Sequence, residues 1–140
     1  MASYSSLADP VTNHDDAYYS AVVCTKFCSM GLVMSMTWTA TYINVMDGVL
    51  RLYDSKETSD QDPTDHVLEI CLAKGHYSSP IRKVFIDQSN VMHQESGAEF
   101  YGFYLMKDYG IMMPLRELKI CCAREDTAER LARVIDSNAN

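Results

Sequence analysis

The stretch TATYINVMDGVLRLYDS, residues 39–55, decides the fold. Two β-prone runs flank Asp47-Gly48, and both alternate between polar and apolar side chains, as strands with one buried face do. Gly48 tolerates the positive φ that a tight primed turn demands, so the stretch predicts a β-hairpin. Because side chains alternate along a strand, Ile43 and Val45 share one face, and we expect that face to be buried.

The rest of the chain continues this pattern and then changes period. Five further stretches have the composition or alternation of strands, namely 21–29, 66–73, 82–86, 100–106 and 115–123, which makes about seven strands in all. The acidic stretch 54–65 predicts a solvated linker. Residues 1–20 predict a flexible polar tail, and residues 21–140 a single folded domain.

The segment EDTAERLARVID, residues 125–136, has the period of a helix instead of a strand. Its apolar residues Ala128, Leu131, Ala132 and Ile135 fall at i, i+3, i+4 and i+7, which is one helical face. Asp126, followed three residues later by Glu129, predicts a capping box at the start of this helix. The sequence therefore predicts a mainly β domain that ends in one amphipathic helix.

Composition narrows the class of protein. The 140 residues are 47% hydrophobic, which is enough for a real core, and the formal net charge is -7. A net negative chain repels nucleic acid and anionic membranes unless its few cations cluster, so we expect no nucleic-acid partner. The first residues lack the features of a signal peptide, and the five cysteines are an odd number, which favours reduced thiols in the cytoplasm.

Residues 41–57, TYINVMDGVLRLYDSKE, resemble the second and third strands of a pleckstrin homology (PH) domain, and residues 125–136 are similar to the closing helix of that family. The resemblance covers roughly residues 21–137. It implies a partly open barrel of about seven antiparallel strands capped by a C-terminal α-helix. One departure is that the family usually places a Trp on the buried face of the helix, whereas Leu131 stands at the matching position.

The resemblance also implies a phosphoinositide pocket, but this chain lacks half of its chemistry. Lys26 matches the first-strand Lys of lipid-binding members, whereas residues 39–41 are Thr, Ala and Thr where arginines would be expected. The usual pocket is therefore not expected. Candidate contacts to an anion or lipid are Lys26, Lys74, Arg82 and Lys83, although the last three fit ordinary solvated charges better.

The segment SMGLVMSM, residues 29–36, falls at the first hairpin of the PH pattern and would form an apolar tip. Met is a flexible and polarizable contact residue that suits adaptable binding surfaces. We therefore take the tip as a candidate surface for docking a partner or wedging into a bilayer, formed by Met30, Leu32, Val33, Met34 and Met36. The competing interpretation, which we weigh more heavily, is that the strand begins early and these side chains pack inside.

Catalytic, metal and cofactor sites are not expected. Cys24 and Cys28 would be about 13 Å apart along a strand, the four histidines lack ligand spacing, and no motif for a nucleophile or a phosphate-binding loop occurs. The sequence favours a non-catalytic, PH-like adaptor or scaffold module for a protein partner, either cytoplasmic or held peripherally at a membrane or the cytoskeleton. Alternatives are a peripheral module that binds phosphoinositide or phospholipid, and a small-ligand or enzymatic β-barrel, which a deep pocket with hydrogen-bonded polar residues would favour.

Overall fold

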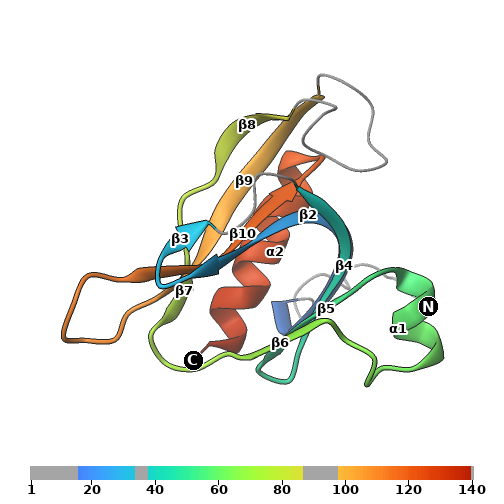
Figure 1. Ribbon diagram of the computed structural model, residues 1–140, viewed down its shortest axis with the longest axis horizontal. Helices are drawn as coiled ribbons and strands as arrows, with labels where there is room; N and C mark the ends of the chain where they lie inside the picture. The colour runs from blue at the N-terminus through green and yellow to red at the C-terminus, as the bar shows by residue number, and fades with distance from the viewer. Residues whose placement is uncertain (1–15, 34–37, 87–97, 140) are drawn as a thin grey trace, which may run out of the picture.

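The computed structural model describes residues 16–33, 38–86 and 98–139, which form a curled antiparallel sheet and two helices (Figure 1). The strands are β2 (Tyr18–Ser29), β3 (Leu32–Val33), β4 (Thr39–Met46), β5 (Val49–Tyr53), β6 (Leu68–Cys71), β7 (His76–Ser78), β8 (Arg82–Ile86), β9 (Ala98–Lys107) and β10 (Leu115–Cys122). The helices are α1 (Lys56–Gln61) and α2 (Glu125–Asn138).

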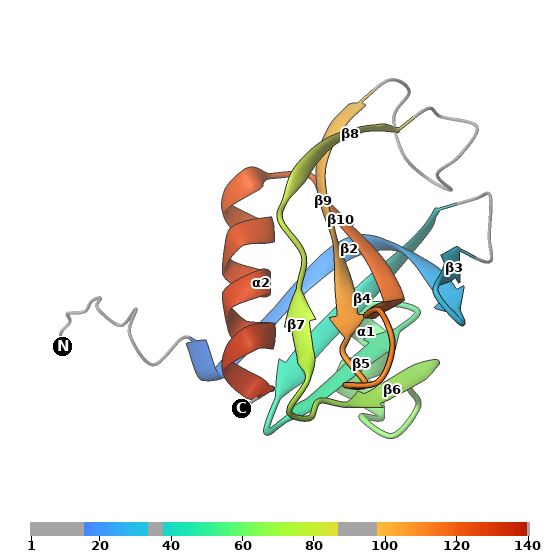
Figure 2. The ribbon, with the colours of Figure 1, turned by 90° about the vertical axis from the view of Figure 1, so that its left-hand side faces the viewer.

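Seven strands follow one path in the order β6-β5-β4-β2-β10-β9-β7, while β3 pairs with β2 and β8 pairs with β9. The strands β2, β4, β5 and β6 form one meander, and β7, β9 and β10 form the other. The pairing of β2 with β10 joins the two meanders. Helix α2 lies along the open side of the curled sheet (Figure 2). The predicted fold, a mainly β, partly open barrel with a C-terminal helix, is therefore confirmed.

The predicted hairpin is present in the expected register. Met46 pairs with Val49 across the turn, and Asp47 and Gly48 have φ values of 55° and 76°. Two consecutive positive φ angles define the primed turn whose twist matches that of the flanking strands. Ile43 and Val45, which share one face, are fully buried, as expected.

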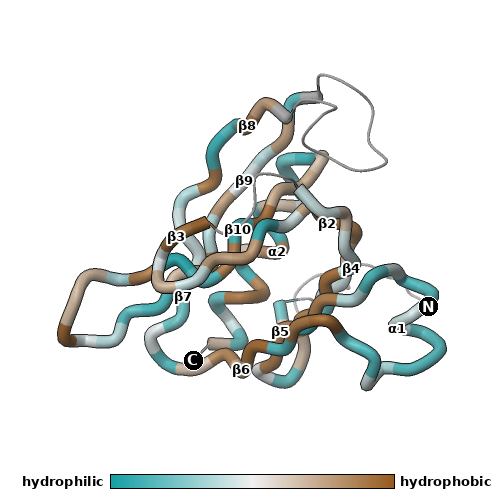
Figure 3. The backbone as a smooth tube through the Cα atoms, in the orientation of Figure 1, coloured by the Kyte–Doolittle hydropathy of each residue, from teal (hydrophilic) through white to brown (hydrophobic). Residues whose placement is uncertain are grey.

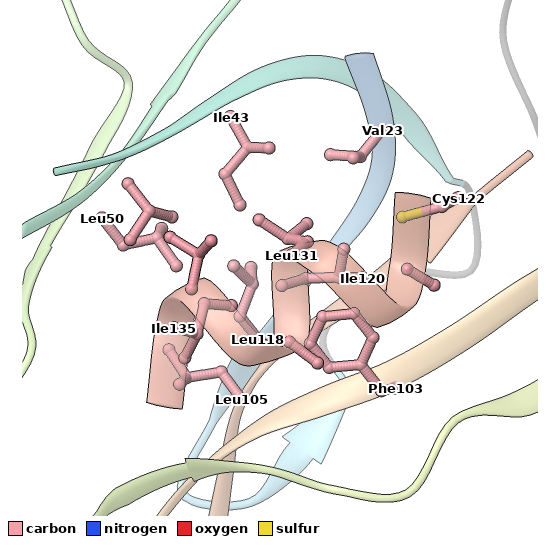
Figure 4. Packing of buried hydrophobic residues seen from close by; sticks show 14 of the residues in the cluster. Val23, Ile43, Leu50, Phe103, Leu105, Leu118, Ile120, Cys122, Leu131 and Ile135 are labelled. Atoms are coloured by element: carbon pink, nitrogen blue, oxygen red, sulfur yellow. The ribbon is translucent and has the colours of Figure 1, made fainter. Parts of the chain in front are cut away.

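The core lies between the inner face of the sheet and the apolar face of α2 (Figure 4). Ile43 and Leu50 come from the first meander and Leu118 from the second, and all three are fully buried. From the helix, Leu131 and Ile135 pack against them and are fully buried as well. The predicted helical face therefore supplies the contact that closes the barrel.

Polar side chains on the last turn of α2 fix the helix to both meanders. The backbone N–H of Gly48 donates to Oδ1 of Asn138 at 2.8 Å. On the other side, Ser78 donates its backbone N–H and its hydroxyl to the Asp136 carboxylate at 2.8 and 2.9 Å. The helix position is thus set by hydrogen bonds as well as by apolar packing.

The predicted capping box is wrong. The N-cap is Arg124, two residues before Asp126, and its side chain makes no capping hydrogen bond. Asp126 lies in the first turn, where its carboxylate accepts from Nε and Nη2 of Arg124 at 3.0 and 2.7 Å. The hydrogen bond from Arg124 lowers the pKa of Asp126 to about 2. An acidic side chain there still favours the positive end of the helix dipole.

One strand boundary and two short elements also differ from the prediction. Strand β2 begins at Tyr18 instead of Ala21, because residues 18–20 pair with residues 44–46 of β4. Within the expected linker, α1 forms because Ser55 caps it by accepting from the backbone N–H of Thr58. Strand β7 was not predicted, since its three residues show no pattern of their own. The first fifteen residues of the predicted tail lie outside the described residues.

Candidate interaction site

Among the described residues, the four most exposed large apolar side chains lie on two loops, which we call the apolar rim. The rim consists of Met30 and Leu32 on the β2–β3 hairpin and of Ile111, Met112 and Met113 on the β9–β10 loop. Met30, Ile111 and Met113 are 88%, 91% and 82% exposed. In Figure 3 hydrophobic colour marks both β3 and the tip of the β9–β10 loop, whereas α1, on the other side of the view, is hydrophilic.

The two loops of the rim meet at one end of the barrel. A Cβ atom added at Gly31 would lie only 3.2 Å from Cδ2 of Leu115, so the β2–β3 turn rests directly on the start of β10. Residues of both loops also line a single pocket at this end of the barrel. Met30 and Gly31 of one loop and Tyr109 of the other line this pocket, so two segments that are distant in sequence border the same end of the barrel.

The turn at the tip of the β2–β3 hairpin uses an unusual residue. Ser29 pairs with Leu32, and the two residues between them, Met30 and Gly31, have φ values of 51° and 84°. Positive φ is common for Gly and tolerated by Asn or Asp, but it is uncommon for a side chain such as Met. The hairpin thus accepts local strain while it holds Met30 out in solvent.

The predicted apolar tip has a mixed outcome. Met30 and Leu32 are exposed and Val33 is half-buried, so the interpretation that the tip packs inside is wrong for the first two. Met34 and Met36 lie outside the described residues. Sequence reasoning missed residues 111–113, whose only signal is a run of three apolar residues next to Gly110 and Pro114.

Between the loops of the rim the barrel opens into a pocket of about 500 Å³, which we call the mouth pocket. Three polar side chains of its lining form a chain. His76 Nε2 lies 2.7 Å from Oε1 of Glu117, and the Tyr109 hydroxyl donates to Oε2 at 3.0 Å. The backbone N–H of Ala73 donates to His76 Nδ1, so Nε2 carries the proton and donates to Glu117. The hydrogen bond to Glu117 raises the pKa of Tyr109.

Glu117 also changes the direction of β10. The register of β10 against β9 shifts between Arg116, which pairs with Met106, and Leu118, which pairs with Leu105. Glu117 is the extra residue of a β-bulge, and such a residue reverses the alternation beyond it. As a result Arg116 shares the outer face of the sheet with Lys119, although strict alternation would place it on the inner face.

Of the four predicted cations, three lie near one another and one lies apart. Lys26 pairs with Lys119 across β2 and β10, and Arg82 and Lys83 line the same outer groove as Lys119. Lys74 sits on the β6–β7 turn, where its carbonyl accepts from Lys107. Sequence reasoning missed Lys119 and Arg116, because finding the first requires the β2–β10 pairing and finding the second requires the bulge.

The cysteines are free thiols, and Cys28 lines the mouth pocket. Burial raises the pKa of Cys28, although the charges of Arg116 and Lys119 act in the opposite direction. In the part of the chain that the structure describes, no group of three or more His, Cys, Asp or Glu side chains is placed to hold a metal ion. Within the same residues, no helix has the length and apolar character to cross a bilayer.

Comparisons with known proteins leave the family open. No protein-family model matches the chain, and no curated protein matches its sequence. The functional argument therefore depends on the surfaces of the molecule itself.

Proposed function

We propose that this chain is a non-catalytic, PH-like interaction module of the cytoplasm and that it docks a protein partner on the apolar rim. The observation that carries the proposal is that both loops of the rim border the mouth pocket and that both carry strongly exposed apolar side chains. Isolated exposed apolar residues are ordinary, whereas a cluster on neighbouring loops is typical of a contact surface. The PH resemblance agrees with this role, because two meanders closed by a terminal helix make a rigid scaffold for loops.

The backbone at Met30 supports the same proposal. Asn would fit the left-handed conformation with less strain, yet the chain places a large apolar side chain there. A local rule is usually broken at a functional position, where contact with another molecule compensates for the cost. Met at such a position also suits a surface that adapts to its partner.

The polar chain in the mouth pocket could suggest an enzyme, but its hydrogen bonds favour a structural role. Both ring nitrogens of His76 are occupied, one by the Ala73 N–H and the other by Glu117, so no lone pair is free to take a proton from a substrate. The raised pKa of Cys28 keeps this thiol protonated and therefore weakly nucleophilic. These contacts tie the β6–β7 turn and the β9–β10 loop to β10 and so hold the rim in place.

A second candidate function is docking to an anionic membrane. It is favoured by Arg116, which lines the mouth pocket between the two loops and would bring a positive charge close to lipid phosphates. Apolar loops beside cations are one way in which proteins attach to a bilayer surface. The net charge of -7 opposes this function, so protein docking remains the primary proposal.

The test compares two double variants that each remove two exposed apolar side chains. Met30→Asn with Ile111→Ser alters the rim, and Val22→Thr with Phe85→Ser alters exposed positions elsewhere on the sheet. Each variant carries the same photo-crosslinker at residue 112, and partners are captured from the native cell. One buried Met or Ile contributes about 1.5–3 kcal/mol, so the rim variant should bind its partner at least tenfold more weakly.

Two measurements decide between the candidate functions: the set of captured partners and sedimentation with vesicles. Loss of the same partners in the rim variant, with retention in the control variant, supports the proposal. An unchanged partner set in the rim variant contradicts it. If both proteins are also mixed with phosphatidylcholine–phosphatidylserine vesicles, rim-dependent sedimentation without any protein partner would replace protein docking with membrane docking.

A further inference from the structure

A groove of about 370 Å³ runs over the outer face of β9, between β8 and β10, and it is strongly basic. Arg82 and Lys83 line one wall, and Arg116 and Lys119 line the other. No carboxylate lines the groove among the residues that the structure describes. This concentration of positive charge is unexpected on a chain whose net charge is -7.

Aromatic rings contact Lys26, Arg116 and Lys119. The Arg116 guanidinium carbon lies 4.8 Å from the centre of the Tyr104 ring, and Lys119 Nζ lies 5.4 Å from the same ring. On the other side, Lys26 and Lys119 place their Nζ atoms 4.8 and 5.1 Å from the ring of Trp38. Cation–π contacts of this kind reduce the freedom that the side chains would otherwise lose when they bind an anion.

Among the described residues, the cations of this cluster other than Lys83 lack internal counter-charges. Within residues 16–33, 38–86 and 98–139, no ion pair is formed by Lys26, Arg116 or Lys119, and Lys83 approaches Glu99 only to 3.9 Å. Burial, and then the charge of Lys119, lower the pKa of Lys26. Like charges held together in this way repel one another, and a bound anion would relieve the repulsion.

The groove also offers a neutral hydrogen-bond donor. Ser79 lines it, and Oγ of Ser79 accepts from the backbone N–H of Tyr104 at 2.7 Å. That bond uses an oxygen lone pair and leaves the hydroxyl hydrogen free to point at a ligand. A phosphate bound between the walls would therefore meet both charged and neutral donors.

We propose that this outer groove binds a compact anion that carries at least two phosphate charges. Arg82, Arg116 and Lys119 around one groove match more than a single negative charge, and the planar fork of Arg suits phosphate oxygens. A nucleic-acid strand is a poorer match, because Trp38 is only 4% exposed and cations already cover the aromatic faces on which bases would stack. The phosphates could be free in solution or carried by a lipid headgroup.

The probe is inorganic tripolyphosphate, titrated calorimetrically into the whole chain at low and at moderate salt. The groove variant Arg116→Gln/Lys119→Gln is compared with a control variant, Lys74→Gln/Arg133→Gln. The control also removes two positive charges, but from positions away from the groove. Because the groove variant removes two charge-assisted hydrogen-bond donors, it should bind at least tenfold more weakly. The control should stay within about twofold of wild type, since distant charges are screened.

Saturable binding that weakens in the groove variant and persists in the control supports the proposal. Absence of binding to wild type at low salt, or equal weakening in both variants, overturns it. Should the groove variant melt early, Arg82→Gln/Lys83→Gln from the opposite wall gives the same comparison. The rim variant of the preceding section should bind tripolyphosphate normally, which separates this test from that of the proposed function.

Vesicles distinguish the two sources of phosphate. Phosphatidylcholine vesicles with and without a bisphosphorylated inositol lipid are sedimented with wild type and with the groove variant. Groove-dependent binding only to the phosphorylated vesicles assigns the ligand to a headgroup. Binding of tripolyphosphate without any binding of these vesicles assigns it to a soluble phosphate. Either result supports the groove as an anion site.

Discussion

At the scale of single residues, two turns of the same geometry are built from different side chains. Asp47 and Met30 both occupy the left-handed region ahead of a glycine. Asp tolerates this conformation because its short polar side chain can hydrogen-bond locally, whereas Met has no such compensation. The first turn is therefore explained by the stability of the hairpin alone, whereas the proposed docking function would explain the second.

The Asp47-Gly48 turn gives a prediction for stability. Replacement Gly48→Ala should lower the free energy of unfolding by about 1–2 kcal/mol, because the Cβ atom is strained at positive φ. Steric contact adds little, since the nearest atom to that Cβ is the Asn138 carbonyl oxygen at 3.8 Å. Urea denaturation measures the change. Asp47→Asn serves as the control and should unfold as wild type does; equal losses in both variants would contradict the explanation.

The cysteines give a prediction for chemical reactivity. Cys71 is exposed, whereas Cys121 and Cys122 are fully buried and burial raises the pKa of each thiol to about 12. Since the thiolate is the reactive form, iodoacetamide should label Cys71 in the native protein and leave the buried pair unlabelled. Peptide mass spectrometry reads the sites. All five thiols should react in urea, and native labelling of Cys122 at the rate of Cys71 would argue against this packing.

At the scale of elements, the two helices differ in how clearly the sequence predicts them. The sequence predicted the buried residues of α2 except Val134, because a 3.6-residue period over several turns is a strong signal. Helix α1 was missed because it buries no residue and depends on a cap from Ser55 and an ion pair between Lys56 and Asp60. Local polar contacts of this kind do not alter the hydrophobic pattern.

The packing of α2 predicts a large difference between its two faces. Leu131→Ala should lower the free energy of unfolding by about 2–5 kcal/mol, because it leaves a cavity where the helix meets the sheet. Glu129→Ala, on the exposed face of the same helix, should change it by less than about 0.5 kcal/mol. Thermal and urea unfolding provide the comparison. Similar effects at the two positions would mean that the helix does not seal the barrel as described.

The candidate sites were harder to predict than the fold, for a physical reason. Sequence patterns report which face of a strand is buried, but not which strands become neighbours. Lys26 was predicted as a candidate contact to an anion or lipid, and only the pairing of β2 with β10 brings Lys119 beside it. Arg116 depends further on the bulge at Glu117. Both the groove and the rim are thus products of long-range contacts.

At the scale of the whole molecule, the buried thiols make stability depend on alkaline pH. Burial raises the pKa of Cys24 to about 11, and those of Cys121 and Cys122 to about 12, from an ordinary value of 9.0. Above pH 9 the unfolded chain therefore loses these protons before the folded chain does. The stabilising contribution is complete below pH 9 and is lost progressively as the pH rises toward the folded values.

Urea midpoints measured from neutral to alkaline pH should therefore fall above about pH 9. In the Cys122→Ala variant the urea midpoint should fall less steeply with pH, because one of the three buried thiols with a raised pKa is absent. Exposed Cys71→Ala is the matched control and should decline as steeply as wild type. A flat profile, or the same slope in all three proteins, would exclude the thiols as the cause.

The adjacency of β2 and β10 has a consequence for biosynthesis. A ribosome emits the first meander well before the strand that must lie beside it, so the nascent chain carries an unpaired edge of β2 until translation has passed β10. Contacts between segments so distant in sequence slow folding, and partly formed sheets with unpaired edges are prone to aggregate. We expect the newly made chain to fold only after the closing helix has left the exit tunnel, and to need protection until then.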